Sequence, residues 1–421
     1  MREFLKAVLV PALLICLFSC KQDKALFKNN NSDIPNFGNV DLKEIFDDPD
    51  RALPNKTETV ATLNQYYENV WEKSDLWGGL LVAKADDILL EKYRGFSQGP
   101  SEGVIGSNTP LHVASVSKTL TAMATLKLVE SGKIKLEDRL TKFFPGFPYP
   151  KVTVKSLLSQ RSGLPKYEYF IEKIEPKPAE LSKKFLTNQD ILNLLVKYKP
   201  ELSKETETGF MYCNTNFALL ALIIEQATKK PFPEAMKAMV FQPLKMDHTY
   251  IFQEKDTATA AKSFYSKGPT VYKLDHLDLI YGDKNVYTTP RDLLNFSQAM
   301  FSKDFLKDNL IKQAFEPYSN EKPGINNYGL GFRMKIFDNG EKITYHNGWW
   351  HGSNTVFVHL LKSKTTIIAI GNKYSRKIYS AMALSGLFEN MPMETDKLKK
   401  EMGIADSLSV DSLQTENNYS E

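Results

Sequence analysis

Apolar residues recur along this chain with two different periods, and each period occupies its own part of the sequence. Alternation typical of a β-hairpin covers 79–84 and 88–93, on either side of Ala85-Asp86-Asp87. Between Ser115 and about residue 285 the spacing is helical, over 116–131, 189–197, 217–229 and 232–240. Strand-like alternation then returns at 328–337, 341–346, 354–361 and 365–371.

Helical spacing also borders the strand-forming regions, at 57–73, 290–303 and near 376–389. Strands therefore come from both ends of the domain and helices from its middle. This order predicts an α+β fold, a mixed antiparallel sheet flanked by helices, with an all-helical lobe inserted. We expect an α/β lobe made of 51–114 and 286–392 and a helical lobe at 115–285. Residues 393–421 are polar and acidic with few aromatics, which predicts a disordered tail.

The N-terminus has the composition of a secretion signal. Arg2 and Lys6 precede an apolar stretch that ends at Phe18 and is too short to span a membrane as a stable helix. Leu17-Phe18-Ser19-Cys20 resembles a bacterial lipobox. We therefore expect residues 1–19 to be a lipoprotein signal peptide and Cys20 to become the lipidated N-terminus. An ordinary signal peptide or an uncleaved anchor is the alternative.

Residues 20–50 are polar and rich in Asn, Asp and Lys, which predicts a tether between the lipid and the domain. Lys21, directly after Cys20, resembles the sorting pattern that directs lipoproteins of Gram-negative cells to the outer membrane. We therefore expect a protein of the cell envelope that is anchored by lipid in the outer membrane and faces the periplasm or the cell surface.

Cysteine usage and charge narrow the possibilities further. Of the three cysteines, Cys16 leaves with the signal and Cys20 carries lipid, so Cys213 alone remains and the mature chain can form no intrachain disulfide. The formal net charge is +4, and no long basic run occurs. Nucleic acid is therefore not an expected partner.

The first candidate for chemistry is Ser115-Val116-Ser117-Lys118, at the start of the predicted helix 116–131. Residues three apart share a helix face, so the lysine ammonium group can reach the serine oxygen. A serine hydroxyl becomes a nucleophile when a base removes its proton, and a desolvated lysine can be that base. A solvated lysine near an N-capping serine is the structural alternative.

Two later clusters supply polar groups that would complete such a site. Tyr212 and Asn214 are two residues apart in Tyr212-Cys213-Asn214, so in an extended segment both face the same side. His346-Asn347-Gly348 follows a strand pattern, which places His346 at a strand end. Gly348 leaves room for a substrate to approach the backbone.

With these three elements the sequence resembles the superfamily of serine β-lactamases and penicillin-binding proteins, in particular its class C β-lactamase-like branch. That branch includes D-Ala-D-Ala carboxypeptidases, D-aminopeptidases and esterases. Three more segments resemble family markers and occur in the family's order: Leu157–Pro165, Phe241–Thr249 and Tyr287–Leu293. The resemblance identifies 51–392 as a serine hydrolase domain.

The resemblance implies a role for each residue. Ser115 would form the acyl-enzyme, Lys118 would take its proton directly or through Tyr212, and Tyr212 would pass the proton to the leaving group. Asn214 would hydrogen-bond Lys118 and the substrate amide. His346 would orient Tyr212 or touch the substrate. The backbone N–H groups of Ser115 and Trp349 would hold the oxyanion. No metal or other cofactor is expected.

One departure from the family pattern bears on the substrate. His346 and Asn347 replace the Lys and Thr of Lys-Thr-Gly, which bind the carboxylate of β-lactams and D-Ala termini in the family. A histidine is mostly neutral at pH 7, so we expect weaker carboxylate binding. This favours a peptidase-, esterase- or amidase-like hydrolase acting on a small acyl, peptide or cell-wall substrate.

Three other interpretations remain open on sequence alone. The chain could be a D-Ala-D-Ala carboxypeptidase or a β-lactamase proper. It could also be a non-catalytic cell-wall-binding lipoprotein with the same fold. A zinc enzyme is the least supported, because His346, His351 and His359 lack the spacing of a zinc motif and have no cysteine nearby.

Overall fold

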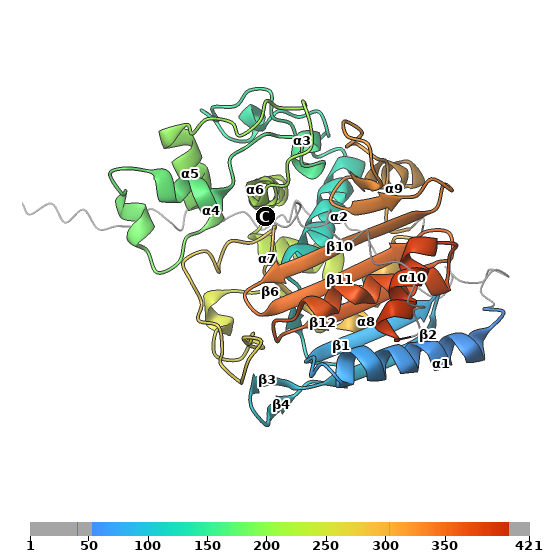
Figure 1. The fold of residues 1–421 in the computed structure, drawn as a ribbon. Helices are drawn as coiled ribbons and strands as arrows, with labels where there is room; N and C mark the ends of the chain where they lie inside the picture. Colours follow the sequence, from blue (N-terminus) through green and yellow to red (C-terminus); the bar gives the residue numbers. More distant parts are fainter. Residues whose placement is uncertain (1–39, 41–52, 303, 404–421) are drawn as a thin grey trace, which may run out of the picture. The chain divides into compact units, whose positions relative to one another are not determined.

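The computed structural model describes residues 40, 53–302 and 304–403, which all lie in one compact unit, Asp33–Glu421. This unit is built on a seven-stranded antiparallel sheet with the order β2-β1-β12-β11-β10-β9-β8 (Figure 1). The strand bounds are β1 Gly78–Lys84, β2 Asp87–Arg94, β8 Asn326–Tyr328, β9 Arg333–Ile336, β10 Lys342–Trp350, β11 Ser353–Leu360 and β12 Thr365–Gly371.

Both faces of the sheet are apolar, since its middle strands are buried from both sides. In β1, Leu81 and Ala83 belong to one hydrophobic cluster, whereas Leu80 and Val82 belong to the other. Successive side chains of a strand point to opposite faces, so a run of apolar residues contributes to two cores at once. The sheet therefore needs a layer of helices on each side.

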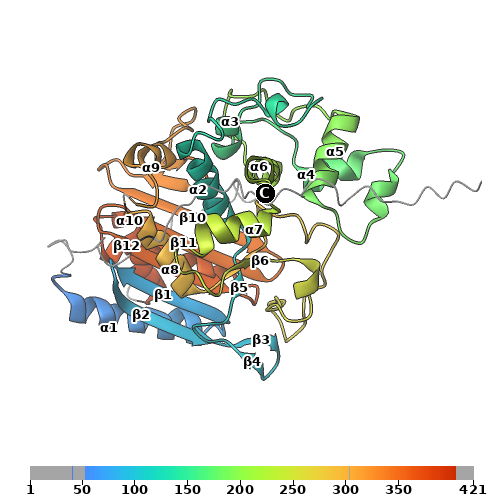
Figure 2. The same cartoon turned by 180° about the vertical axis from the view of Figure 1, so that it is seen from behind.

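One face carries helices from both ends of the domain: α1 Lys56–Tyr66, its π-helical continuation η3 Tyr67–Glu72, the 3-10 helix η10 Arg376–Leu387, and α10 Pro392–Glu401. The other face carries α2 Ser117–Glu130 and α8 Pro290–Ala299, which are seen best from behind (Figure 2). α2 is thus enclosed between the sheet and the inserted lobe, and every side chain from Ser117 to Leu128 is buried.

The inserted lobe consists mainly of short helices. Their bounds are η4 Ala114–Val116, η5 Leu140–Lys142, α3 Val154–Leu158, α4 Tyr167–Phe170, η6 Ile171–Lys173, η7 Ala179–Ser182, α5 Asn188–Tyr198, α6 Asn214–Thr228, α7 Phe232–Met236 and the π-helix η8 Lys237–Phe241. Between Ile251 and Val286 the one regular element is the 3-10 helix η9 Glu254–Asp256. A long irregular segment inside a compact domain usually serves a function.

Two small sheets and one more helix complete the described elements. β3 Phe96–Gly99 pairs with β4 Glu102–Val104, and β7 Val286–Thr288 lies between β5 Leu111–His112 and β6 Tyr250–Ile251. Helix α9 covers Asp308–Ala314. β6 interrupts the lobe that the sequence pattern predicts to be all-helical, because it pairs with β7, which follows the end of that lobe.

The structure confirms the predicted fold class, and it corrects three details. The pattern at 328–337 is two strands, β8 and β9, because Gly329 and Gly331 allow a turn between them. β10 continues to Trp350, so His346 lies within a strand and not at its end. The disordered tail predicted from 393 is wrong for the first residues, since α10 buries Leu398 and Glu394.

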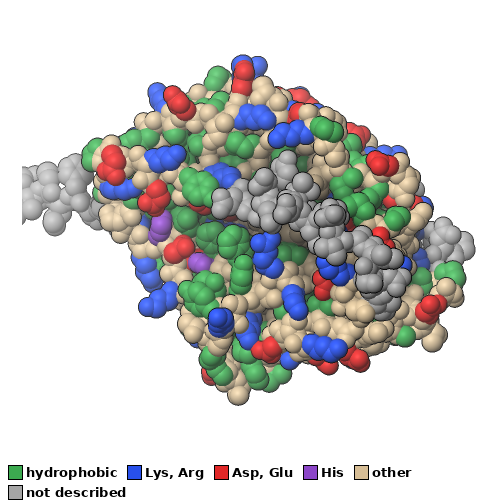
Figure 3. All heavy atoms as spheres, viewed as in Figure 1, with side chains coloured by type: hydrophobic (Ala, Val, Ile, Leu, Met, Phe, Trp, Pro, Cys, Tyr) green, Lys and Arg blue, Asp and Glu red, His purple; other side chains and the backbone are tan. Residues whose placement is uncertain are grey.

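Other predictions fall mostly outside the described residues. Residues 1–19 and Cys20 are not described, and of the predicted tether 20–50 only Val40 is. Val40 is buried and its N–H donates to the Pro243 carbonyl at 3.2 Å. Within 53–302 and 304–403, no helix combines the length and the apolarity needed to cross a bilayer. On the face in Figure 3, cationic and anionic side chains are interspersed.

A buried histidine makes stability depend on pH. Burial lowers the pKa of His359 to about 3, and its Nδ1 pairs with Ser297 Oγ at 2.7 Å. An unfolded histidine has a pKa near 6.5, so below this pH the unfolded chain binds a proton that the folded chain does not. Stability therefore falls as the pH drops from about 6.5 toward 3.

We predict that His359→Asn, which keeps an acceptor for Ser297, reduces the pH dependence of the free energy of unfolding by at most about 1.4 kcal/mol per pH unit. Urea unfolding of variant and wild type at several values between pH 6.5 and 4.5 measures this slope. His276→Asn, at a half-buried surface position, is the control and should leave the slope unchanged. Equal slopes for His359→Asn and wild type would contradict the prediction.

Candidate active site

Ser115 lies where the chain passes from strand to helix. β5 ends at His112, the 3-10 turn η4 follows, and α2 begins at Ser117. Ala114 adopts a φ of +46°, a left-handed conformation that costs an L-residue about 1–2 kcal/mol. This sharp turn presents Ser115 at the entrance of a buried helix, which is where the Ser-x-x-Lys spacing predicts it.

Lys118 is one turn further along and is fully buried. Its Nζ donates to Ser115 Oγ at 3.0 Å and to the backbone carbonyl of Asp283 at 2.8 Å. The rings of Tyr212 and Phe217 lie with their centroids 5.0 Å and 5.8 Å from the same Nζ. Neither hydrogen-bond acceptor is a carboxylate, so no ion pair with a described residue has to break before the lysine exchanges a proton with the serine.

Tyr212 reaches the site from the loop before α6. Gln160 holds this loop, because its side-chain carbonyl accepts from the Cys213 N–H at 2.9 Å and from Asn216 Nδ2 at 2.7 Å. Cys213 is buried, and burial raises the pKa of its thiol to about 12. The thiol therefore packs and does not react. Gln160 therefore has a structural role here.

The contacts of Asn214 differ from those predicted from the sequence. Its Nδ2 donates to the Glu168 carboxylate and not to a substrate position, and its Oδ1 is buried with no hydrogen-bond partner in the described part of the chain. The predicted hydrogen bond between Asn214 and Lys118 is therefore wrong in this structure. The reason is that α4 brings Glu168 against the amide, which no spacing in the sequence reveals.

His346 lies in β10 beside Tyr212, with ring centroids 6.1 Å apart, and is fully buried. Burial, together with the positive charges of Arg333 and Lys118, holds the pKa of this imidazole well below its usual range. Its Nδ1 is 2.7 Å from the Asn347 carbonyl and its Nε2 is 3.4 Å from the Tyr328 hydroxyl. A neutral His346 can thus orient the tyrosines but is covered from substrate.

Gly348 packs directly over the serine turn. A Cβ added to it would lie 2.3 Å from the Val113 carbonyl oxygen and 3.2 Å from Ser115 N, so no side chain fits. The close approach brings the backbone of Gly348 and Trp349 next to the backbone N–H of Ser115, as the predicted oxyanion site requires. The Trp349 side chain itself is 58% exposed.

Tyr379 of η10 supports the same stretch of β10 from the other side. Its hydroxyl donates to the Gly348 carbonyl at 3.0 Å and accepts from Asn354 Nδ2 at 2.8 Å. The Gly348 carbonyl and the Trp349 N–H belong to one peptide group. Tyr379 therefore fixes the orientation of the peptide whose N–H is the predicted oxyanion donor. Asn347, next to it, has a buried Oδ1 with no partner among the described residues.

Arg333 is a site residue that the sequence motifs do not contain. It lies at the start of β9, opposite Tyr345 of β10, and its guanidinium carbon is 4.6 Å from the centroid of the Tyr212 ring. The sequence does not predict this contact, because the position of Arg333 against Tyr212 depends on how β9 pairs with β10. The site thus holds a fixed cation although His346 has replaced the family lysine.

One group of described residues has the composition of a metal site. The ligand atoms of Asp275, Asp278 and His351 lie within 4.8 Å of one another. Asp278 already accepts from His351 Nε2 at 2.9 Å, from Trp350 Nε1 at 2.6 Å and from the Asp275 N–H. These hydrogen bonds hold the Asp278 carboxylate in a fixed orientation. The described histidines His346 and His359 are buried in other surroundings.

Comparisons with known proteins agree with this geometry. The chain is 29% identical to penicillin-binding protein 4* of Bacillus subtilis over 335 residues, which is 76% of this chain and 72% of that protein. A crystal structure of a penicillin-binding protein from Bacillus halodurans matches with a TM-score of 0.67 and 25% identity, covering 76% of this chain and 99% of that one.

A D-amino acid amidase from Ochrobactrum anthropi, solved with L-phenylalanine amide, has the same fold, with a TM-score of 0.62 and 19% identity over 82% of this chain and 99% of that one. The sequence profile of the Beta-lactamase family matches residues 63–382, more than half of the chain. This match and the fold show that the chain belongs to the Beta-lactamase family, within the superfamily of serine β-lactamases and penicillin-binding proteins.

Proposed function

We propose that this protein is a serine hydrolase that cleaves amide or ester bonds through an acyl-enzyme on Ser115. The observation that carries the proposal is the 3.0 Å contact between Lys118 Nζ and Ser115 Oγ, made by a fully buried lysine. Burial keeps water from competing for the serine proton, and a nucleophile within hydrogen-bond reach of its base is the arrangement that acyl transfer needs.

The proposed reaction has two halves. Lys118 removes the proton from Ser115 Oγ as this oxygen attacks the substrate carbonyl carbon, and the N–H groups of Ser115 and Trp349 stabilise the oxyanion. Tyr212 then passes a proton to the leaving nitrogen or oxygen as its bond to carbon breaks. In the second half a water gives up a proton by the same route, attacks the acyl carbon, and releases the acid and free Ser115.

The proposed substrates are amides or peptides of D-amino acids. The similarity to a D-amino acid amidase and to penicillin-binding proteins supports this class. Cleavage of simple esters through the same acyl-enzyme is compatible with the geometry, since an ester needs less help for its leaving group.

Arg333 favours a second candidate, a carboxypeptidase that recognises a free C-terminal carboxylate. The sequence motif predicts weak carboxylate binding because His346 is neutral and Asn347 uncharged. Arg333, beside Tyr212, supplies the missing positive charge from the neighbouring strand. An arginine fork binds a carboxylate through two charge-assisted hydrogen bonds.

The nucleophile is tested by covalent labelling. We expect Ser115→Ala to lose labelling by a fluorophosphonate and by fluorescent penicillin, together with all turnover of D-amino-acid amides, because no oxygen remains to form the acyl-enzyme. Ser117→Ala is the matched control: Ser117 is buried and accepts from the Val286 N–H at 3.1 Å, so its loss lowers stability while labelling persists. Labelling of a folded Ser115→Ala variant would overturn the proposal.

The role of Arg333 separates the two candidates. We expect Arg333→Met to lower kcat/KM for a D-Ala-D-Ala peptide with a free carboxylate by roughly 10- to 150-fold relative to the same peptide as its amide, the range for loss of one charge-assisted contact of about 1.5–3 kcal/mol. Arg291→Gln, on the exposed side of α8, should leave this ratio unchanged. An unchanged ratio in Arg333→Met would contradict the carboxypeptidase candidate and leave the amidase as the remaining one.

We also propose a lipid-anchored location in the cell envelope, on the basis of the lipobox that ends at Cys20. We predict that Cys20→Ser moves the protein from the membrane fraction to the soluble fraction, because acyl chains on this residue would hold it there. Fractionation of cells that express each form, followed by immunoblotting, measures the shift. A variant that stays with the membrane would show that residues 7–18 act as an anchor.

A further inference from the structure

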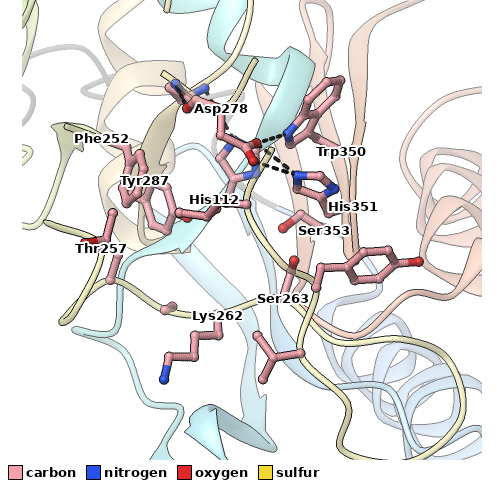
Figure 4. Close-up of a pocket in the computed structure, with 16 residues that line it drawn as sticks. His112, Phe252, Thr257, Lys262, Ser263, Asp278, Tyr287, Trp350, His351 and Ser353 are labelled. Carbon is pink, nitrogen blue, oxygen red and sulfur yellow. Dashed lines mark hydrogen bonds and ion pairs between the residues drawn. The ribbon is translucent and has the colours of Figure 1, made fainter. Parts of the chain in front are cut away.

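A cavity of about 130 Å³ lies beside the candidate active site, between the irregular segment that follows β6 and the turn that joins β10 to β11 (Figure 4). One ordered water needs roughly 10–15 Å³ by the same measure, so the cavity has room for several heavy atoms of a ligand. Its walls are aromatic, and they include Phe252, Tyr272, Tyr287 and Trp350. Aromatic walls of this kind enclose the aliphatic part of a ligand.

β10 runs from the serine turn to the cavity. Gly348 packs against Ser115 N, and Trp350, two residues further, lines the cavity. A strand advances about 3.3 Å per residue, which places the Trp350–His351 end roughly 7–10 Å from the serine. A substrate lying along this strand edge would thus bring the far end of its acyl part, and not the scissile bond, to the cavity.

The floor of the cavity holds two acceptors. Asp278 is buried, and Figure 4 shows its carboxylate hydrogen-bonded to Trp350 and His351. Ser353 is 1% exposed, and its Oγ has no hydrogen-bond partner in the described part of the chain. A buried hydroxyl without a partner is uncommon in a native fold, and it indicates a group that a ligand satisfies.

The charge at this floor is set by the Asp278 carboxylate and the groups around it, of which His351 Nε2 lies 2.9 Å from Asp278 Oδ1. Asp278 is the buried carboxylate among the lining residues, and the amino group of Lys262 points away from it in Figure 4. Burial lowers the pKa of His112 to about 3, so this imidazole adds no positive charge. Lys284 Nζ lies 4.7 Å from the centroid of the Trp350 ring. The same Nζ forms an ion pair with Asp283 Oδ2 at 3.5 Å.

We propose that this cavity is a subsite for the acyl part of the substrate and takes an acyl group that ends in a primary ammonium, bound by the Asp278 carboxylate and the Ser353 hydroxyl. The ammonium would lie about 7–10 Å from the scissile carbonyl, the reach of a lysine-type side chain or of the N-terminus of a dipeptide. This proposal rests on acyl transfer at Ser115 and adds the class of acyl group that is preferred.

The test compares two esters of equal length and shape. The p-nitrophenyl esters of 6-aminohexanoic and heptanoic acid differ in a terminal ammonium or methyl group. At pH 8 a primary amine is charged, whereas an imidazole of ordinary basicity is not. We expect the amino ester to have a kcat/KM at least roughly ten-fold higher in the wild type, as for one charge-assisted contact.

Asp278→Asn keeps an oxygen acceptor for Trp350 and should reduce the ratio of the two kcat/KM values to about one. Asp308→Asn, an exposed carboxylate in the first turn of α9, is the matched control and should keep the wild-type ratio. Ala261→Leu fills the cavity without removing a polar group. It should lower the kcat/KM of both long esters relative to that of p-nitrophenyl acetate, whose acyl group is too short to reach the cavity.

The outcomes separate this proposal from the one on which it rests. Loss of fluorophosphonate labelling in Ser115→Ala tests the nucleophile and does not depend on the cavity. A wild type that hydrolyses both long esters equally, or an Asp278→Asn variant that labels normally and keeps the ratio, would overturn the subsite. D-lysyl and glycyl-D-alanyl esters, compared in the same way, show which of the two sources of the ammonium is preferred.

Discussion

The structure depends on keeping a lysine in the protein interior at hydrogen-bond distance from a serine. Lys118 donates to Ser115 Oγ from a helix, α2, whose side chains from Ser117 to Leu128 are all buried. Neighbouring segments can pack this close to α2 only where they have no side chain. A Cβ on Gly331 would lie 2.3 Å from Ala122 Cβ of α2. A Cβ on Gly348 would lie 2.3 Å from the Val113 carbonyl oxygen, in the turn that precedes α2. The sheet, the β8–β9 turn and the inserted lobe are thus arranged around one buried amino group, which donates hydrogen bonds to the Ser115 hydroxyl and the Asp283 carbonyl.

The protonation of the titratable groups in the site depends on the burial and the charges around each of them. His346 is neutral because burial and two nearby cations, Arg333 and Lys118, all disfavour its protonation. On the other side of the site, Glu168 has its pKa raised by burial and holds the amide of Asn214. The site therefore has a cationic side at β9 and an acceptor-rich side at α4. A substrate with a carboxylate at one end and hydrogen-bond donors at the other fits this polarity.

The sequence predicts best the features that repeat over many residues. The β1–β2 hairpin, α5 and α6 follow from strong periodicity, and the spacing of Ser115 and Lys118 predicts their contact because a helix fixes it. Contacts between distant segments are not predictable in this way. Arg333 reaches Tyr212 through strand pairing, and Glu168 captures Asn214 through the packing of a four-residue helix. α10 escaped prediction because its polar sequence hides the few side chains, such as Leu398, that it buries.

The hydrogen bond from Tyr379 to the Gly348 carbonyl ties the oxyanion peptide to one of the last elements of the domain. All three motifs precede this tyrosine in the chain, and β12 completes the sheet before it. A polypeptide that emerges in order from a ribosome would therefore have its serine, its lysine and the β10–β11 pairing that holds this peptide before Tyr379 can add its hydrogen bond to the Gly348 carbonyl.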